Sequence, residues 1–257
     1  MARNNFESCL QEILRHEGGF SDVRSDPGNW TGGRVGAGLL KGTKYGISAA
    51  AYPTIDIKNI TVEFAASQYK NKYWNRVKGD QLPDGIDLVA FDPAVNSGVS
   101  RGSRWLQSAL GVTQDGKIGP QTVLAAQTAT DGVAVIKRAC AARMGFLRGL
   151  TSLWSTYSRG WTRRVASVEA TAVAMYTRSS VAVRQERKKA STTAKAQATG
   201  AASSAAGGAG GASLDGLPDL AAYGLIALAV VVAVVLISKS RTNAARATAY
   251  KQKEAKA

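Results

Sequence analysis

Apolar side chains recur at helical spacing at the start of the chain. Within residues 4–17, Phe6, Leu10 and Ile13 fall on one face of a helix, and Glu17 ends that face. The pattern predicts an amphipathic first helix that turns its last residue toward the core side of the domain.

The same spacing predicts further helices, at residues 61–75, 84–96, 100–110, 120–129, 131–148 and 160–178. Thr61 is placed to cap the helix at 61–75, and Pro93 is expected to kink or end the helix at 84–96. Pro120 suits the first turn of the helix at 120–129. Residues 21–44 are rich in Gly, Ser, Asp and Pro and predict a loop or short hairpin. Strand signals are few, so about residues 1–178 are predicted to be mainly α.

The pattern changes toward the C-terminus. Residues 179–219 combine a basic stretch with an Ala, Gly, Ser and Thr run, which predicts a flexible linker. Residues 220–238, "LAAYGLIALAVVVAVVLIS", carry no charge between Asp219 and Lys239 and are long enough to span a bilayer as one transmembrane helix. A buried core helix fits this segment less well, because it follows a linker and precedes a basic tail, 239–257.

Charge adds an expectation about partners. The chain has 257 residues, with 33 Lys and Arg against 18 Asp and Glu, a formal charge of +15. Such a charge indicates an anionic partner, either anionic lipid or a wall polymer, and no nucleic-acid motif is present. The basic run at 178–189 fits that partner or a solvated helix end. One histidine and two cysteines, Cys9 and Cys140, form no metal-binding spacing, so no metal or cofactor is expected.

The candidate chemistry lies in "LRHEGGFSDVRSDPGN", residues 14–29. Glu17 falls at the end of the first helix, where the negative end of the helix dipole disfavours a carboxylate. Gly18 and Gly19 stop the helix and leave room for a ligand beside the acid. A glycosidase needs one protonated carboxyl group as general acid. The position alone also fits a solvated surface glutamate.

Several motifs in order carry a family resemblance. "HEGGF", "DPGN" and "GTKYGIS", with "FDPAVNSG" at 91–98 and "RGWTRRV" at 159–165, resemble glycoside hydrolase family 108, the N-acetylmuramidases of phage endolysins and secretion-activator-like proteins. The resemblance covers about residues 5–170. It implies a lysozyme-like fold that cuts the β-1,4 bond between N-acetylmuramic acid and N-acetylglucosamine, with Glu17 as the catalytic glutamate.

Resemblance to phage lysozymes suggests two further catalytic residues. Asp26, nine residues after Glu17, would stabilise the oxocarbenium-like charge or position a water, and Thr43 would hold that water. Asp22 is a competing candidate. Asp26 equally fits a turn residue before Pro27.

The resemblance also implies residues that bind substrate. Tyr45 and Asn96 would line the sugar cleft, although Asn96 also fits a residue that ends a helix. The chain departs from the family at Trp30 and at an insertion, 31–40. This insertion is either a lip with Trp30 stacking on a sugar or a tolerated loop.

A second module is predicted after the catalytic region. Residues 101–126 resemble the small helical peptidoglycan-binding module, with Trp105 and Leu106 turned inward. The expected domains are therefore a lysozyme-like catalytic domain, 1–97, and a peptidoglycan-binding module, 98–178.

The sequence leaves two alternatives for the location of the enzyme. The basic tail predicts a cytoplasmic C-terminus and a catalytic domain on the other side of the membrane. The N-terminal sequence has no apolar segment of a secretory signal, which conflicts with that orientation. The enzyme is then either tethered to the inner face of the host membrane until that membrane is breached, or carried in a virion to open the wall.

The sequence thus predicts a membrane-tethered, bacteriolytic peptidoglycan hydrolase of phage or prophage type. One alternative is a lytic transglycosylase, which needs a single acid. Another is an inactive peptidoglycan-binding anchor or secretion factor.

Overall fold

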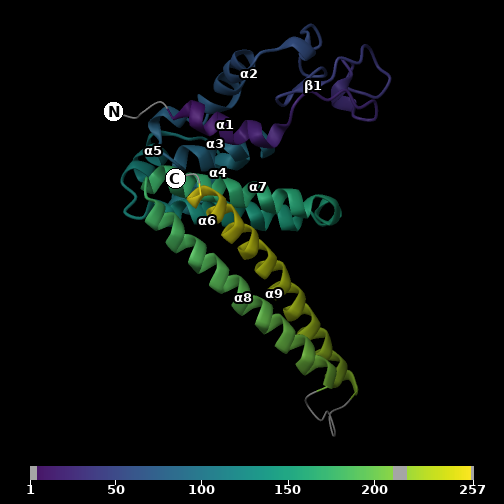
Figure 1. Cartoon of the computed structure of the whole chain (residues 1–257), viewed down its shortest axis with the longest axis vertical. Coiled ribbons are helices and arrows are strands. Elements are labelled where there is room, and N and C mark those ends of the chain that lie inside the picture. Colours follow the sequence, from purple (N-terminus) through teal and green to yellow (C-terminus); the bar gives the residue numbers. More distant parts are fainter. Residues whose placement is uncertain (1–4, 211–218, 256–257) are drawn as a thin grey trace. The chain divides into compact units, whose positions relative to one another are not determined.

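The computed structural model describes residues 5–210 and 219–255 (Figure 1). The chain divides into two compact units, residues 1–145 and 146–257. Both are built mostly from helices, so the prediction of a mainly α fold is confirmed.

The core of the first unit forms where α1 (Phe6–Glu17) meets α3 (Ile86–Ser97). The rings of Phe6, Trp74 and Phe91 meet with centroids between 5.2 and 5.9 Å apart. Because α3 is buried on all sides from residue 86 to residue 94, it is the central helix that the others cover.

The predicted helix over 61–75 is present in two parts. The Thr61 hydroxyl accepts a hydrogen bond from the Phe64 N–H at 3.2 Å and caps α2 (Val62–Tyr69), as expected. A π-helical segment, Lys70–Trp74, continues α2. Such segments often occur at functional sites.

The structure places no helix boundary at Pro93. Helix α3 continues through Pro93 to Ser97, and α4 (Val99–Leu110) follows. A Cβ atom on Gly102 of α4 would lie 2.9 Å from the amide nitrogen of Ala94. Gly102 therefore allows α4 to approach the backbone of α3 closely.

A buried glutamine organises the loop between α4 and α5 (Pro120–Gln127). The Gln107 side chain donates to Asp115 Oδ1 at 2.7 Å and to the Lys117 carbonyl at 3.0 Å, and it accepts from the Gly116 N–H at 2.9 Å. Helix α5 begins at Pro120, as predicted. Helix α6 (Gly132–Gly149) then carries the chain into the second unit.

Short strands and turns follow α1. Strands β1 (Thr43–Lys44) and β2 (Ile47–Ser48) are antiparallel, with Thr43 opposite Ser48. The two turn residues, Tyr45 and Gly46, have φ of 52° and 73°, as type I′ hairpin turns require. Short 3₁₀ helices lie at Pro27–Asn29, Ile57–Asn59 and Gly79–Gln81.

The second unit consists of α7 (Thr151–Thr177), α8 (Ser180–Gly210) and α9 (Asp219–Glu254). Figure 1 shows α8 and α9 as a long antiparallel pair. Residues 226–254 of α9 contain a stretch long and apolar enough to cross a membrane. This stretch overlaps the predicted span, 220–238, and its helix continues into the basic tail.

Helix α8 replaces much of the predicted flexible linker. The sequence predicts a linker over 179–219, whereas residues 180–210 are helical and residues 211–218 lie outside the described chain. Alanine has the highest intrinsic helix propensity, and α9 gives the small side chains of α8 a surface to pack on. Composition alone does not reveal that α8 packs against α9.

Candidate active site

A cleft of about 320 Å³ lies at the C-terminal end of α1. The cleft is lined by α1, by β2 with the turns on either side of it, by α2 with its π-helical continuation, and by α3. The lining side chains include Glu17, Ile47, Tyr52, Gln68, Tyr69, Lys72, Tyr73 and Asn96. Among the residues that the structure describes, Glu17 is the one acidic side chain that lines this cleft.

The first helix delivers Glu17 to the cleft. Glu17 follows the buried Ile13 by one helical turn and is the last residue of α1. Gly18, with φ of 73°, ends the helix. A Cβ atom on Gly18 or Gly19 would meet nothing within 4 Å. These glycines thus leave open space beside the acid.

Gly46 packs directly against the acid. A Cβ atom on Gly46 would lie 3.1 Å from Glu17 Oε2 and would clash with the hydroxyl of Tyr69. The same hydroxyl donates a hydrogen bond to the Tyr45 carbonyl at 2.9 Å. The β-turn, Tyr69 and Glu17 therefore form one packed group in which position 46 must be glycine.

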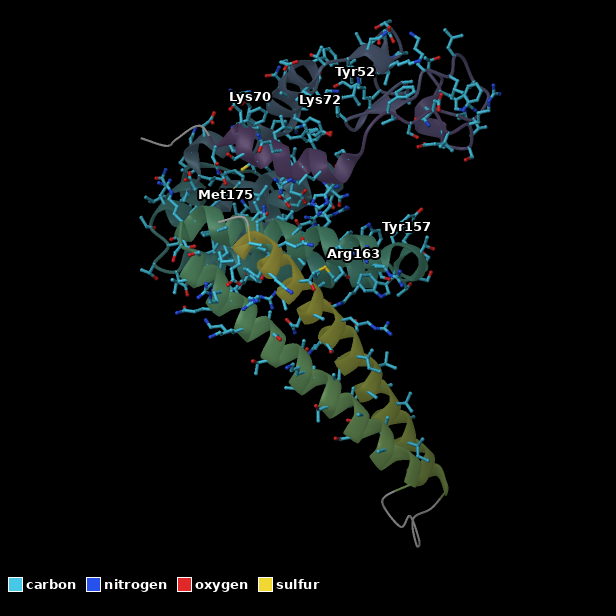
Figure 2. The ribbon with its side chains drawn as sticks, viewed as in Figure 1. Tyr52, Lys70, Lys72, Tyr157, Arg163 and Met175 are labelled. Carbon is cyan, nitrogen blue, oxygen red and sulfur yellow. The ribbon has the colours of Figure 1, made fainter. Side chains whose placement is uncertain are left out.

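Another wall of the cleft is polar and cationic. The Tyr52 hydroxyl donates to Gln68 Oε1 at 2.9 Å, and Lys72 Nζ lies 4.2 Å from the centroid of the Tyr52 ring (Figure 2). A lysine over an aromatic face gains a cation–π interaction. These contacts hold a positive charge beside the cleft.

Asn96 lines the cleft from the last turn of α3. Its Oδ1 accepts from Arg143 Nη2 at 3.2 Å and from the Ser97 hydroxyl at 3.1 Å. Arg143 is itself anchored by a buried ion pair with Asp92. Because both contacts use Oδ1, the amide N–H groups of Asn96 are the ones that can donate to a sugar.

The other predicted catalytic residues lie outside the lining of this cleft. The exposed Asp26 accepts a hydrogen bond from the Gly28 N–H at 2.8 Å and caps a 3₁₀ helix. The Thr43 backbone exchanges two hydrogen bonds of 2.8 Å with Ser21. Asp22 is exposed on the same loop. Asp26 thus has the turn role that the sequence left open.

The two remaining predicted binding residues also lie outside the cleft lining. The Tyr45 side chain packs beside Lys44, whose Nζ lies 5.3 Å from the ring centroid. The Trp30 indole N–H donates to the Arg24 carbonyl at 2.9 Å. Trp30 also pairs with Leu40 across the base of the insertion.

Several cleft residues were not predicted from the sequence. Tyr69 and Tyr73 fall within the helix predicted over 61–75, and Tyr69 is buried. Gln68 and Lys72 are four residues apart, as are Tyr69 and Tyr73, so each pair shares a helix face. These two pairs of polar and aromatic residues, each at a spacing of four, are the sequence signal that could have identified this side of the cleft.

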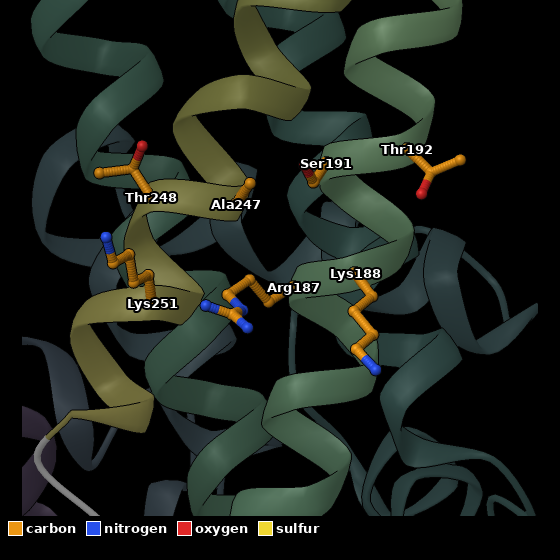
Figure 3. A pocket seen from close by; sticks show the side chains of 7 residues that line it. All are labelled: Arg187, Lys188, Ser191, Thr192, Ala247, Thr248 and Lys251. Atoms are coloured by element: carbon orange, nitrogen blue, oxygen red, sulfur yellow. The ribbon is translucent and has the colours of Figure 1, made fainter.

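A second pocket, of about 420 Å³, lies between α8 and α9 (Figure 3). Arg187, Lys188 and Lys251 line it together with hydroxyl side chains, and its lining contains no acid. It therefore cannot supply a general acid. Within residues 5–210 and 219–255, no three His, Cys, Asp or Glu side chains group as metal ligands.

Comparisons with known proteins match two families to consecutive parts of the chain. The family model described as Glycosyl hydrolase 108 matches residues 10–98, and the one described as Predicted Peptidoglycan domain matches residues 101–166. Nine chains of solved structures match. One, titled "Structure of Brucella abortus SagA", is 34% identical, with a TM-score of 0.55, over 67% of this chain and 95% of that chain. No significant match is found among the curated proteins.

An acid-bearing cleft followed by a peptidoglycan-binding domain defines a glycoside hydrolase that acts on peptidoglycan. The chain belongs to the glycosyl hydrolase 108 family.

Proposed function

We propose that this protein is an N-acetylmuramidase that cleaves the β-1,4 bond between N-acetylmuramic acid and N-acetylglucosamine, with Glu17 as general acid. The observation that supports this most is the position of Glu17 in the cleft, against Gly46 and Tyr69. The acid would protonate the glycosidic oxygen as the bond breaks and the sugar gains oxocarbenium character.

The second catalytic group is proposed to come from the loop that follows Glu17. Asp26 would stabilise the positive charge on the sugar or position the attacking water, and Thr43 would hold that water. In the structure Asp26 is bound to the Gly28 N–H. Asp26 can take part in catalysis only if the substrate extends beyond the cleft, or if its carboxylate gives up the hydrogen bond from the Gly28 N–H.

A lytic transglycosylase is the second candidate, and a specific observation favours it. Within the described chain, Glu17 is the one carboxyl group that lines the cleft. A transglycosylase needs one acid and no carboxylate to activate water, because a hydroxyl of the muramic acid itself attacks. The two activities leave different ends, anhydro or reducing, on the products.

Lys72 and Asn96 fit the substrate of either activity. The peptide stems of peptidoglycan carry carboxylates, and Lys72 is the one basic residue lining the described cleft. The amide of Asn96 would donate to an N-acetyl carbonyl or a sugar hydroxyl. Trp30 and Tyr45 remain proposed contacts for sugar units bound outside the cleft.

Residues on α7 are proposed to help hold the wall. Tyr157, labelled in Figure 2, is 52% exposed. Its ring stacks on that of Trp161, with centroids 5.6 Å apart. Trp161 falls within the match to the peptidoglycan domain, residues 101–166. The exposed ring of Tyr157, supported by the half-buried Trp161, offers an apolar surface to the ring of a sugar.

The biological role is proposed to be wall opening by a membrane-tethered enzyme of phage or prophage type. The peptidoglycan-binding domain and the apolar helix in α9 support this role. The alternative of an inactive wall-binding anchor predicts binding without turnover.

Turnover of purified peptidoglycan by the full chain in detergent tests the proposal. Glu17→Gln keeps the shape of the side chain and removes the proton donor, so we expect release of soluble fragments to fall at least about a thousandfold. Glu63→Gln, on the exposed side of α2, is the matched control and should retain activity. Equal activity in both variants would exclude Glu17 as the acid. An inactive wild type that still binds the wall would establish the anchor.

A further inference from the structure

Small side chains line the contact between α8 and α9. Ala194 and Ala201 of α8 and Ala233 of α9 are each less than a tenth exposed. A Cβ atom on Gly200 would lie 3.4 Å from Leu236 Cδ1, within van der Waals contact. Small residues at such a seam let two helices approach closely, as they do in membranes.

Polar side chains join the two helices where the apolar segment of α9 ends. The Ser240 hydroxyl donates to the Ala194 carbonyl at 2.9 Å, and the Asn243 amide donates to Gln197 Oε1 at 2.9 Å. These contacts fix the register of α8 against α9.

The last turns of α9 are held against α7. Glu169 of α7 is 4% exposed, and its Oε1 accepts from Arg246 Nε and from the Tyr250 hydroxyl, each at 2.8 Å. Separating α9 from α7 would break the ion pair and both hydrogen bonds of Glu169 and would uncover the fully buried Tyr250 ring. The basic tail therefore stays with α7.

The apolar part of α9 exposes large side chains that no protein segment covers within the described residues. Leu228, Val231, Val234 and Val235 are between 45% and 60% exposed. A stretch of this size and polarity is typical of a surface in contact with lipid.

The facing part of α8 is compatible with the same environment. Residues 196–210 carry no charged side chain. The hydroxyls of Thr199, Ser203 and Ser204 donate to carbonyls one turn back in their own helix, at 2.9 to 3.2 Å. Hydroxyl groups satisfied in this way are tolerated inside a bilayer.

Charge is segregated along the helix pair. Residues 196–238 contain no lysine or arginine. Basic side chains gather instead at the other end of the pair, where Arg187 and Lys188 of α8 and Lys251 of α9 surround the second pocket (Figure 3). Lysine and arginine stay on the cytoplasmic side of a membrane, so this distribution places both helix ends on that side.

We infer that α8 and α9 enter the lipid bilayer together as a helical hairpin, with α7 and the basic tail on the same side of the membrane. The basic tail alone predicted a single span with the tail across the membrane from the enzyme, an orientation that conflicts with the lack of a secretory signal segment. That topology would break the contacts of Glu169 with Arg246 and Tyr250, whereas the hairpin keeps them.

The hairpin bears on how the enzyme reaches its substrate. Before α8, the described chain contains no candidate span, so the catalytic unit lies on the same side as α7. The flanking charges make this the cytoplasmic side. The inference favours the alternative in which the enzyme reaches the wall only after the membrane is breached, and it holds whether or not Glu17 is the acid.

The topology is tested by counting labels on single molecules. The full chain with Ser152→Cys on α7 and Ala255→Cys after α9 is reconstituted into vesicles of phosphatidylethanolamine and phosphatidylglycerol and treated with a membrane-impermeant maleimide. Both positions are exposed, whereas Cys9 and Cys140 are buried, and burial raises the pKa of the Cys9 thiol. Mass spectrometry then gives the number of labels per chain.

The hairpin predicts molecules with no label or two labels, whatever the orientation of insertion. A single span predicts one label on each molecule and would overturn the inference. Insertion itself is read from Val231→Cys, which should be protected in vesicles and labelled after solubilisation in dodecyl sulfate. Labelling of Val231→Cys in intact vesicles would also overturn it.

Two neighbouring alanines provide a matched pair for the seam. Ala201 faces α9 and is 3% exposed, whereas Ala202 faces outward. In the double-cysteine background, Ala201→Leu should separate the helices and produce molecules with one label, and Ala202→Leu should not. The same labelling pattern in both variants would contradict pairing of α8 and α9 in the bilayer.

Discussion

Gly46 lies against the carboxyl group of Glu17, so close that a Cβ atom at position 46 would stand 3.1 Å from Oε2. Gly46 also has φ of 73°, a conformation that L-residues rarely adopt. The two residues are 29 positions apart in the chain, and their contact joins the C-terminal end of α1 to the β-turn.

Replacement of Gly46 should therefore disable the site. Gly46→Ala introduces both a positive-φ strain of about 1 kcal/mol and a clash beside the acid. We expect peptidoglycan turnover to fall by at least about tenfold, which corresponds to about 1.4 kcal/mol in the barrier. Initial rates of fragment release measure this effect.

Gly145 of α6 is the control for that substitution. A Cβ atom on Gly145 meets nothing within 4 Å, and Gly145 lies outside the cleft lining, so Gly145→Ala should retain activity. Full activity of Gly46→Ala would show that the turn does not position Glu17.

The sequence predicts the helices and the place of Glu17 at the end of α1 better than it predicts the walls of the cleft. Helical spacing identifies α1 and its last residue, Glu17, because both depend on local pattern. The walls of the cleft depend on which elements meet, and Lys72 and Gly46 reach it through tertiary packing. For the same reason α8 was predicted as a linker, since its stability depends on a partner helix distant in the sequence.

Lys72 should affect substrate binding more than the chemical step. Lys72→Met removes the positive charge beside Tyr52 while keeping much of the side-chain length. We expect KM for peptidoglycan to rise by roughly three- to tenfold with kcat little changed, because about 1 kcal/mol is typical of a partly exposed ion pair.

Lys58→Met provides the comparison for Lys72→Met, because Lys58 is exposed and outside the cleft lining. Wall material with amidated stem carboxylates should reduce the difference between Lys72→Met and the wild type. A difference that persists on amidated wall would show that Lys72 does not recognise those carboxylates.

The buried ion pair behind Asn96 should dominate the stability of the first unit. Asp92 and Arg143 are 0% and 3% exposed, so removal of one charge leaves the other buried without its partner. We expect Arg143→Met to lower the free energy of unfolding by about 3–5 kcal/mol. Chemical denaturation followed by tryptophan fluorescence measures it, and a loss below about 1 kcal/mol would contradict this account.

Asp87 should make stability depend on pH. Burial raises the pKa of Asp87 to about 7, despite hydrogen bonds from Asn5, Gly85 and Leu88 that act in the opposite direction. The folded protein thus holds a proton that the unfolded chain releases near pH 4. Stability from this group is fully present below about pH 4 and is lost as pH rises through about 7.

Asp87→Asn keeps the side-chain oxygen that accepts from the backbone and removes the titration. The difference in melting temperature between wild type and Asp87→Asn should therefore change between about pH 4 and pH 7 and stay constant above that window. A difference that is independent of pH would show that the pKa of Asp87 is the same in the folded and the unfolded protein.

The chemistry of the new glycan ends tests the central claim most directly. The full chain is incubated with purified peptidoglycan, wild type beside Glu17→Gln, and the fragments are analysed by mass spectrometry before and after borohydride reduction. The account predicts reducing N-acetylmuramic acid ends from the wild type and none above background from Glu17→Gln. Reducing N-acetylglucosamine ends, anhydro-muramic acid ends, or the same fragments from both proteins would contradict it.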